Sequence, residues 1–208
     1  MYTAIIHIIL YAIEALLILG IFEALCNEKT FIIQNKIKTI LFITLIIFAT
    51  YWTRLHMSLV YHTPLLVVVD ILLIACITKT RIFDSIVIVS LFFTILFTTE
   101  FLVQIILMLI FNINLNQSIL IPKYFWIVLV LSKILQIIIV TLIFKFNSYF
   151  TKLKLFEKEG AVFANLIIEL GVFSILTFCI NYGIFNIKNV QTYNFIIFII
   201  YFIFLIAK

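Results

Sequence analysis

YFWIVLVLSKILQIIIVTLIF, residues Tyr124–Phe144, decides the fold class of this chain. A helix needs about 20 consecutive apolar residues to cross the hydrocarbon core of a bilayer, and this stretch is long enough. It carries one formal charge, Lys133, near its middle. A charged side chain at that depth is costly, so it indicates an anionic partner or a functional site. The stretch therefore predicts a transmembrane helix with a buried cation.

The composition extends this prediction to the whole chain. Apolar residues make up 66% of the 208 residues and charged residues 11%, which is far from the average of soluble domains. The net charge of +5 does not indicate nucleic-acid binding, because the lysines lie between apolar segments. We expect an all-α, polytopic membrane helix bundle that forms a single transmembrane domain (1–208) without a soluble domain. Its principal partner is then the lipid bilayer.

About seven transmembrane helices are expected. Thr63-Pro64 predicts the start of the third helix and Pro122 the start of the fifth, because proline is tolerated at the first helical position. The fourth segment is long, but Thr98-Thr99-Glu100 contains no turn former, so it is predicted to be one helix. The expected spans are 4–25, 39–53, 64–78, 84–111, 124–144, 161–182 and 193–207.

Basic residues predict the orientation. With seven spans, ten lysines and arginines fall on the side of Lys145 and three fall on the other side, while Lys133 lies within a span. Cytoplasmic loops collect such residues, so the N-terminus is expected outside and the C-terminus inside. The first span has no preceding Lys or Arg and is read as a retained helix rather than a cleavable signal peptide. The expected location is the plasma membrane of a bacterium.

Five ionisable residues are expected near the middle of their spans. Lys133 is predicted to pair with Asp70 first, since both lie near the centre of their helices, and Glu14 fits nearly as well. Three interpretations stay open: a structural ion pair, a ligand site or switch, and a pathway for protons or cations. The residues are Glu14, Asp70, Glu100, Lys133 and Glu169.

A second group of polar residues is expected at the outer membrane surface. It is interpreted either as interfacial anchoring beside Trp52 or as the mouth of a ligand site, which His7 could also line. The residues are Arg54, His56, His62, Asn112 and Asn114. The scattered histidines and the three cysteines lack metal-ligand spacing, so no metal and no cofactor is expected.

Enzymatic activity is not expected. An intramembrane cysteine peptidase needs a thiol beside a histidine. Cys76 and His62 are 14 residues apart, which is roughly 21 Å along a helix.

The layout resembles a known family. Ser132-Lys133 lies within the fifth span, an asparagine-rich loop precedes it, and KFNSYFTKLKLFEKEG follows it. This order is similar to the membrane sensor region of the GHKL-type histidine kinases of the accessory gene regulator kind. The resemblance implies a part in two-component signal transduction and quorum sensing, an extracellular peptide signal, a homodimer and a cytoplasmic kinase domain. This sequence has no phospho-accepting histidine helix or ATP-binding boxes, so kinase activity itself is not implied.

Three functions remain open at this point. The first is a sensor or receptor module that passes an extracellular signal to a cytoplasmic partner. The second is a small membrane transport component that binds substrate or protons at the buried charges. The third is a structural membrane protein without a ligand.

Overall fold

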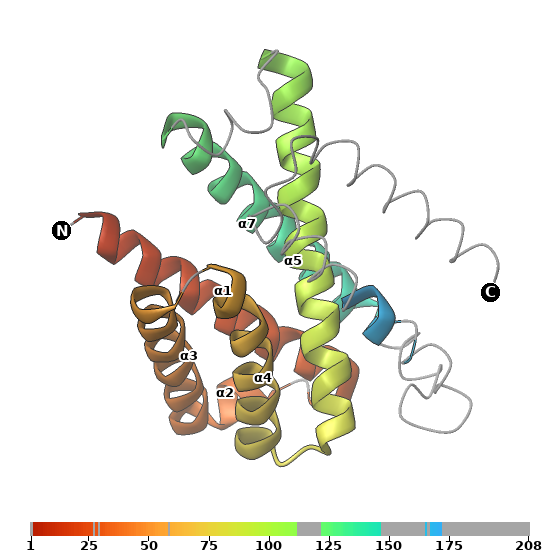
Figure 1. Ribbon diagram of the computed structural model, residues 1–208. Helices are drawn as coiled ribbons and strands as arrows, with labels where there is room; N and C mark the ends of the chain where they lie inside the picture. Colours follow the sequence, from red (N-terminus) through yellow and green to blue (C-terminus); the bar gives the residue numbers. More distant parts are fainter. Residues whose placement is uncertain are drawn as a thin grey trace.

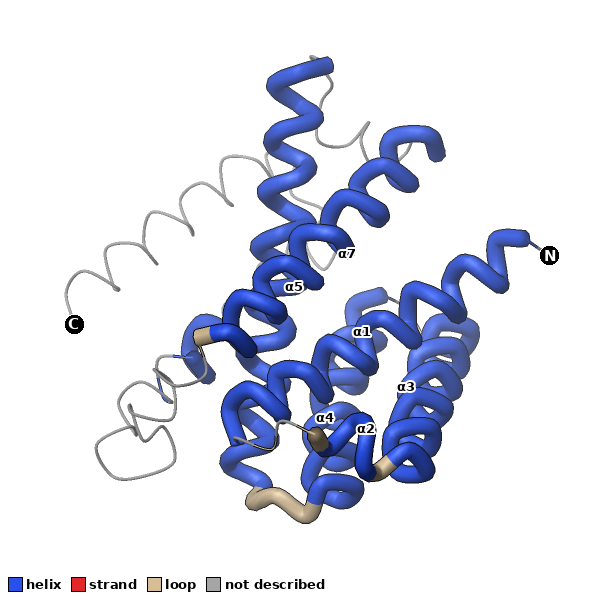
Figure 2. Tube along the Cα trace, turned by 180° about the vertical axis from the view of Figure 1, so that it is seen from behind, coloured by secondary structure: helices blue, strands red, loops and turns tan. Residues whose placement is uncertain are grey.

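In the computed structural model the described residues form α-helices and contain no strand (Figure 1, Figure 2). Of the predicted spans, 161–182 lies largely outside the described residues and 193–207 lies wholly outside them. The structure describes residues 2–26, 28, 30–57, 59–111, 122–146, 165 and 167–171.

Within the described residues, four helices are long and apolar enough to cross a membrane: α1, α3, α5 and α7. A fifth, α4, has a shorter apolar stretch at His62–Thr78. The chain is therefore a helical membrane protein, as its composition predicts. The helices are α1 (Tyr2–Cys26), α2 (Phe31–Gln34), α3 (Lys36–His56), α4 (Leu59–Thr78), α5 (Ile82–Phe111) and α7 (Pro122–Lys145).

The prediction that residues 84–111 form one helix is confirmed, because α5 runs without a break through Thr98-Thr99-Glu100. Pro122 is the first residue of α7, also as predicted. The predicted start at Pro64 is wrong. The helix begins at Leu59, and Pro64 lies inside it. Proline lacks the N–H that would bond the carbonyl four residues earlier, and membrane helices tolerate this loss.

Helix α1 is the centre of the bundle. It packs against α3, α5 and α7, while α4 lies between α3 and α5, and α7 crosses α5 (Figure 1). A tight connection joins α4 to α5, and Lys79 at its start has the left-handed backbone conformation (φ 61°) that often ends a helix. The short helix α2 is held by Glu23 of α1, whose Oε1 accepts a hydrogen bond of 2.7 Å from the Ile32 N–H.

The apolar core forms where α1 meets its neighbours. Phe22 of α1 packs edge-to-face on Phe31, with ring centroids 5.1 Å apart, and Phe42 and Ile74 are fully buried beside it. The outward faces of the helices are equally apolar, and Ile37 is 85% exposed. Exposed apolar faces on this scale fit contact with lipid rather than water.

Two glycines allow close helix contacts. A Cβ at Gly20 of α1 would lie 3.1 Å from Cγ1 of Val140 in α7. A Cβ at Gly171 would lie 2.6 Å from the Cβ of Ser90 and 2.8 Å from its Cα. The helical segment 167–171 therefore lies directly against α5, and its Ile167 belongs to the main core.

Candidate functional site: a buried polar network and an arginine cluster

The buried cation Lys133 pairs with Glu14. Its Nζ lies 2.5 Å from Oε1 of Glu14, and the two side chains are 4% and 25% exposed. The prediction that Lys133 pairs first with Asp70 is wrong, and the alternative partner, Glu14, is confirmed. Lys133 is on α7, which packs against α1, whereas α4 makes no packing contact with α7 among the described residues. Equal depth in the membrane does not make two helices neighbours.

The ion pair continues into a chain of hydrogen bonds, which we name the Lys133 network: Glu14, Lys133, Gln136 and Thr99. Lys133 also donates to Oε1 of Gln136 at 3.1 Å, and Nε2 of Gln136 donates to the Thr99 hydroxyl at 3.0 Å. Thr99 in turn bonds a carbonyl of its own helix. Gln136 is fully buried. The network therefore joins α1, α7 and α5 through side chains alone.

Two more acids lie close to this network. Glu100 follows Thr99 in α5, and the charges of Lys133 and Glu14 both act on it. Asp70 is 5% exposed and lies within the electrostatic influence of Glu14. Its Oδ1 is buried and makes no hydrogen bond within the described part of the chain. Four of the five predicted ionisable residues thus lie in one electrostatic neighbourhood.

Glu169 is the fifth predicted residue, and it is arranged differently. Its side chain is exposed, although it was expected near the middle of a span. It lies on the segment 167–171 that packs against Ser90 through Gly171.

A second polar group, the Arg54 cluster, consists of Arg54, Tyr11, His7 and Trp126. Nη1 of Arg54 donates to the Tyr11 hydroxyl at 2.6 Å and lies 3.3 Å from Nδ1 of His7. The His7 ring stacks on Tyr11 and tilts against Trp126, with centroid distances of 6.1 and 5.8 Å. The cluster joins the beginning of α1, the end of α3 and the beginning of α7.

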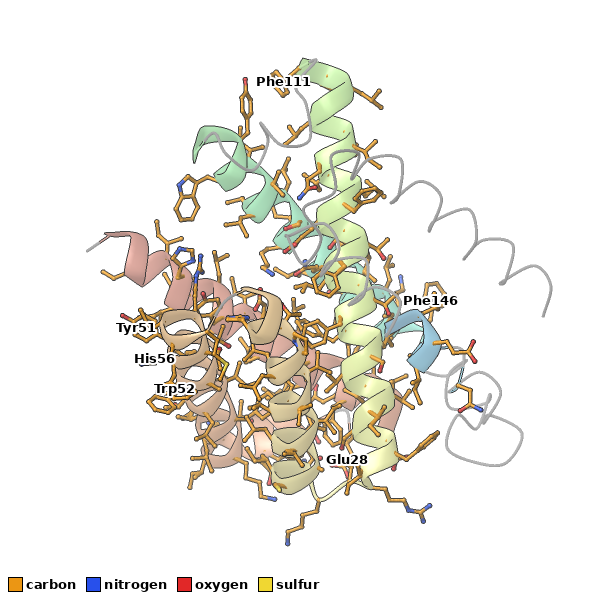
Figure 3. All side chains as sticks on the ribbon, in the orientation of Figure 1. Glu28, Tyr51, Trp52, His56, Phe111 and Phe146 are labelled. Atoms are coloured by element: carbon orange, nitrogen blue, oxygen red, sulfur yellow. The ribbon has the colours of Figure 1, made fainter. Side chains whose placement is uncertain are left out.

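The other residues predicted to line the outer mouth lie in different surroundings. His62 is half-buried within the influence of the Arg54 charge, and its Nε2 makes no hydrogen bond within the described part of the chain. His56 is exposed and contacts Trp52, with centroids 5.2 Å apart. Figure 3 shows Tyr51, Trp52 and His56 on the side of α3 that is turned away from the bundle. Interfacial anchoring fits this position better than the mouth of a ligand site. Asn112 and Asn114 lie outside the described residues.

Sequence reasoning missed Tyr11, Thr99, Gln136 and Trp126. Gln136 carried a usable signal, because it is a polar residue in an apolar run and lies one helical turn from Lys133. Tyr11 and Trp126 carried none, since aromatic residues are common throughout the chain. In the described part of the chain, no group of three or more His, Cys, Asp or Glu side chains could hold a metal ion.

No protein-family model, no curated protein and no solved structure matches this chain.

Proposed function

We propose that this protein is a membrane-embedded sensor module that detects an extracellular signal, a peptide or small molecule, and passes it to a cytoplasmic partner. One observation carries the proposal. His7, Tyr11 and Glu14 follow one another at spacings of four and three residues on α1, which places them along one face of the helix. The Arg54 cluster and the Lys133 network are therefore connected through a single helix face.

This connection supports a mechanism of helix displacement. A ligand that contacts the Arg54 cluster would move the first turns of α1 relative to α3 and α7. Because Glu14 is about one turn farther along, the same movement changes its distance from Lys133. A buried charge either has its partner or carries a large desolvation penalty. The pair therefore favours discrete arrangements of the helices over gradual changes.

The proposal includes the topology expected from the basic residues. The chain has seven spans, an external N-terminus and a cytoplasmic C-terminus in a bacterial plasma membrane. The cytoplasmic partner is a histidine kinase or kinase domain, and the module forms a homodimer. The order of the helices supports this orientation. Lys79 follows the end of α4 and Lys145 ends α7, so both belong to the lysine-rich side that is expected in the cytoplasm. Arg54, near the end of α3, and Trp126, near the start of α7, belong to the opposite side.

The test measures movement between α1 and α7 in the full chain in nanodiscs. Spin labels near the first turns of the two helices report their distance before and after addition of spent growth medium from the native host. We expect a shift in wild type and no shift in a folded Lys133→Met variant. An unchanged distance in wild type would reject the sensor proposal.

One observation favours a transport component as the second candidate. The buried Oδ1 of Asp70 makes no hydrogen bond within the described residues, so this carboxyl has capacity for a proton or a substrate group. Saturable uptake by cells that express the chain, lost in Asp70→Asn, would support transport. Uptake equal to that of cells without the protein would remove this candidate.

A further inference from the structure

The hydrogen bonds of the Arg54 cluster fix which atoms donate. An arginine side chain has five N–H donors and no acceptor. In its contacts with Tyr11 and His7, Nη1 of Arg54 is therefore the donor, and the Tyr11 oxygen and His7 Nδ1 are acceptors. The His7 proton must then lie on Nε2, and the Tyr11 hydroxyl proton is directed elsewhere. Both residues keep a donor for a further partner.

The guanidinium group has donors left as well. Within the described residues, hydrogen bonds involve its Nη1, and no carboxylate pairs with it, since the one ion pair found there is Lys133 with Glu14. Nε and Nη2 form the side of the guanidinium that binds planar oxyanions with two parallel hydrogen bonds. The Arg54 side chain is exposed and can reach such a group.

The cluster is thus a set of donors around a fixed positive charge. Tyr11 is 8% exposed and holds Arg54 in place, which reduces the entropy that the arginine would lose on binding. The rings of His7 and Trp126, 5.8 Å apart, form an aromatic side to the cluster. An oxyanion attached to an apolar or aromatic body is complementary to both features.

We propose that Arg54, Tyr11 and His7 form a binding site for one oxyanionic group, a carboxylate or a phosphate. This inference rests on the proposed function and gives the chemistry of the ligand group that α1 would sense. Two sources supply that chemistry: a soluble ligand and the head group of an anionic lipid.

The test uses Trp126 as the reporter. The chain has two tryptophans, so Trp52→Phe leaves Trp126, beside His7, as the single tryptophan, which is excited selectively over the tyrosines. The full chain is held in dodecyl maltoside micelles, which carry no phosphate. One arm titrates inorganic phosphate or acetate against chloride at constant ionic strength. The other adds short-chain phosphatidylglycerol, with phosphatidylcholine as the zwitterionic control.

A saturable change in emission in the first arm identifies a soluble ligand, and a change confined to phosphatidylglycerol identifies a lipid head group. Either result supports the site. We expect Arg54→Gln to raise the Kd at least tenfold and Tyr11→Phe to raise it severalfold. Arg81→Gln, which removes the other arginine of the chain, is the matched control and should bind like wild type.

No saturable change in either arm, or an equal change in Arg54→Gln, would overturn the proposal. If Arg54→Gln does not fold, Arg54→Lys decides, because it keeps the charge but loses the paired donors. Its Kd should rise, and binding equal to wild type would reject the site. The titration involves no cytoplasmic partner, so failure of the sensor proposal and failure of this site are distinguishable.

Discussion

Lys133 in α7 and Glu14 in α1 are separated by 119 positions in the sequence, and their charged atoms lie 2.5 Å apart inside the bundle. The pair connects the first transmembrane helix with the last long helix that the structure describes. Gln136 and Thr99 extend this connection to α5.

Replacing Lys133 with Met should lower the free energy of unfolding by about 3 kcal/mol or more, because Glu14 would lose its cationic partner. The measurement is denaturation of the purified chain in mixed micelles of dodecyl maltoside and sodium dodecyl sulfate. The double variant Glu14→Gln/Lys133→Met should recover part of this loss, since neither charge remains. Ile134→Met, at an exposed neighbouring position, is the control. Equal stability of Lys133→Met and wild type would contradict the pairing.

Gln136→Leu should lower the free energy of unfolding by about 1–3 kcal/mol, the usual cost of leaving buried polar groups without partners. Lys133 would lose one acceptor, and Thr99 would lose its donor from α7. The same denaturation experiment measures the effect. Thr141→Val is the matched control, since this exposed hydroxyl bonds only its own helix among the described contacts. A loss no larger than that of the control would mean that the hydrogen bonds contribute little.

Gly171→Ala should destabilise the protein more than Gly20→Ala. The new Cβ at position 171 would meet the backbone Cα of Ser90 at 2.8 Å, and backbone atoms cannot easily move aside. At position 20 it would meet the end of the Val140 side chain at 3.1 Å, which can turn away. Melting temperatures in detergent compare the two variants. A similar shift in both would show that the segment 167–171 does not pack tightly on α5.

The proposed orientation is testable with cysteine labelling. Cys76 is exposed near the end of α4 that leads to Lys79 and Arg81. In a Cys26→Ala/Cys179→Ala background, a membrane-impermeant maleimide should label Cys76 after cell lysis but not in intact cells. His56→Cys in a background without other cysteines should be labelled in intact cells. The reverse pattern would invert the topology.

The helices α1, α3, α5 and α7 could be located from the sequence because each contains a long apolar run. Their lateral arrangement could not. In a soluble helix the polar face indicates which side is exposed, but in α1 and α5 apolar residues occur on every side and the few polar residues form no broad polar face. The expected pairing of Lys133 therefore depended on depth alone, and depth did not distinguish Glu14 from Asp70.

The start of α4 was mispredicted for a related reason. The sequence favours Pro64 as the first helical residue, because proline is preferred at that position. In lipid, the residues before it gain more from completing backbone hydrogen bonds than they lose at one proline. The helix therefore continues back to Leu59.

The length of α5 has a consequence for the membrane around it. Its 30 residues extend over roughly 45 Å, whereas the hydrocarbon core of a bilayer is about 30 Å thick. The last residues, Leu109, Ile110 and Phe111, expose apolar side chains that a thin bilayer would leave uncovered. Thinning would favour a greater tilt of α5, and the tie from Thr99 to Gln136 lies just beyond the midpoint of the helix. A tilt about that point moves the ends of α5 and leaves Thr99 almost in place. We therefore expect the Lys133 network to be retained in bilayers of different thickness, while the ends of α5 change position.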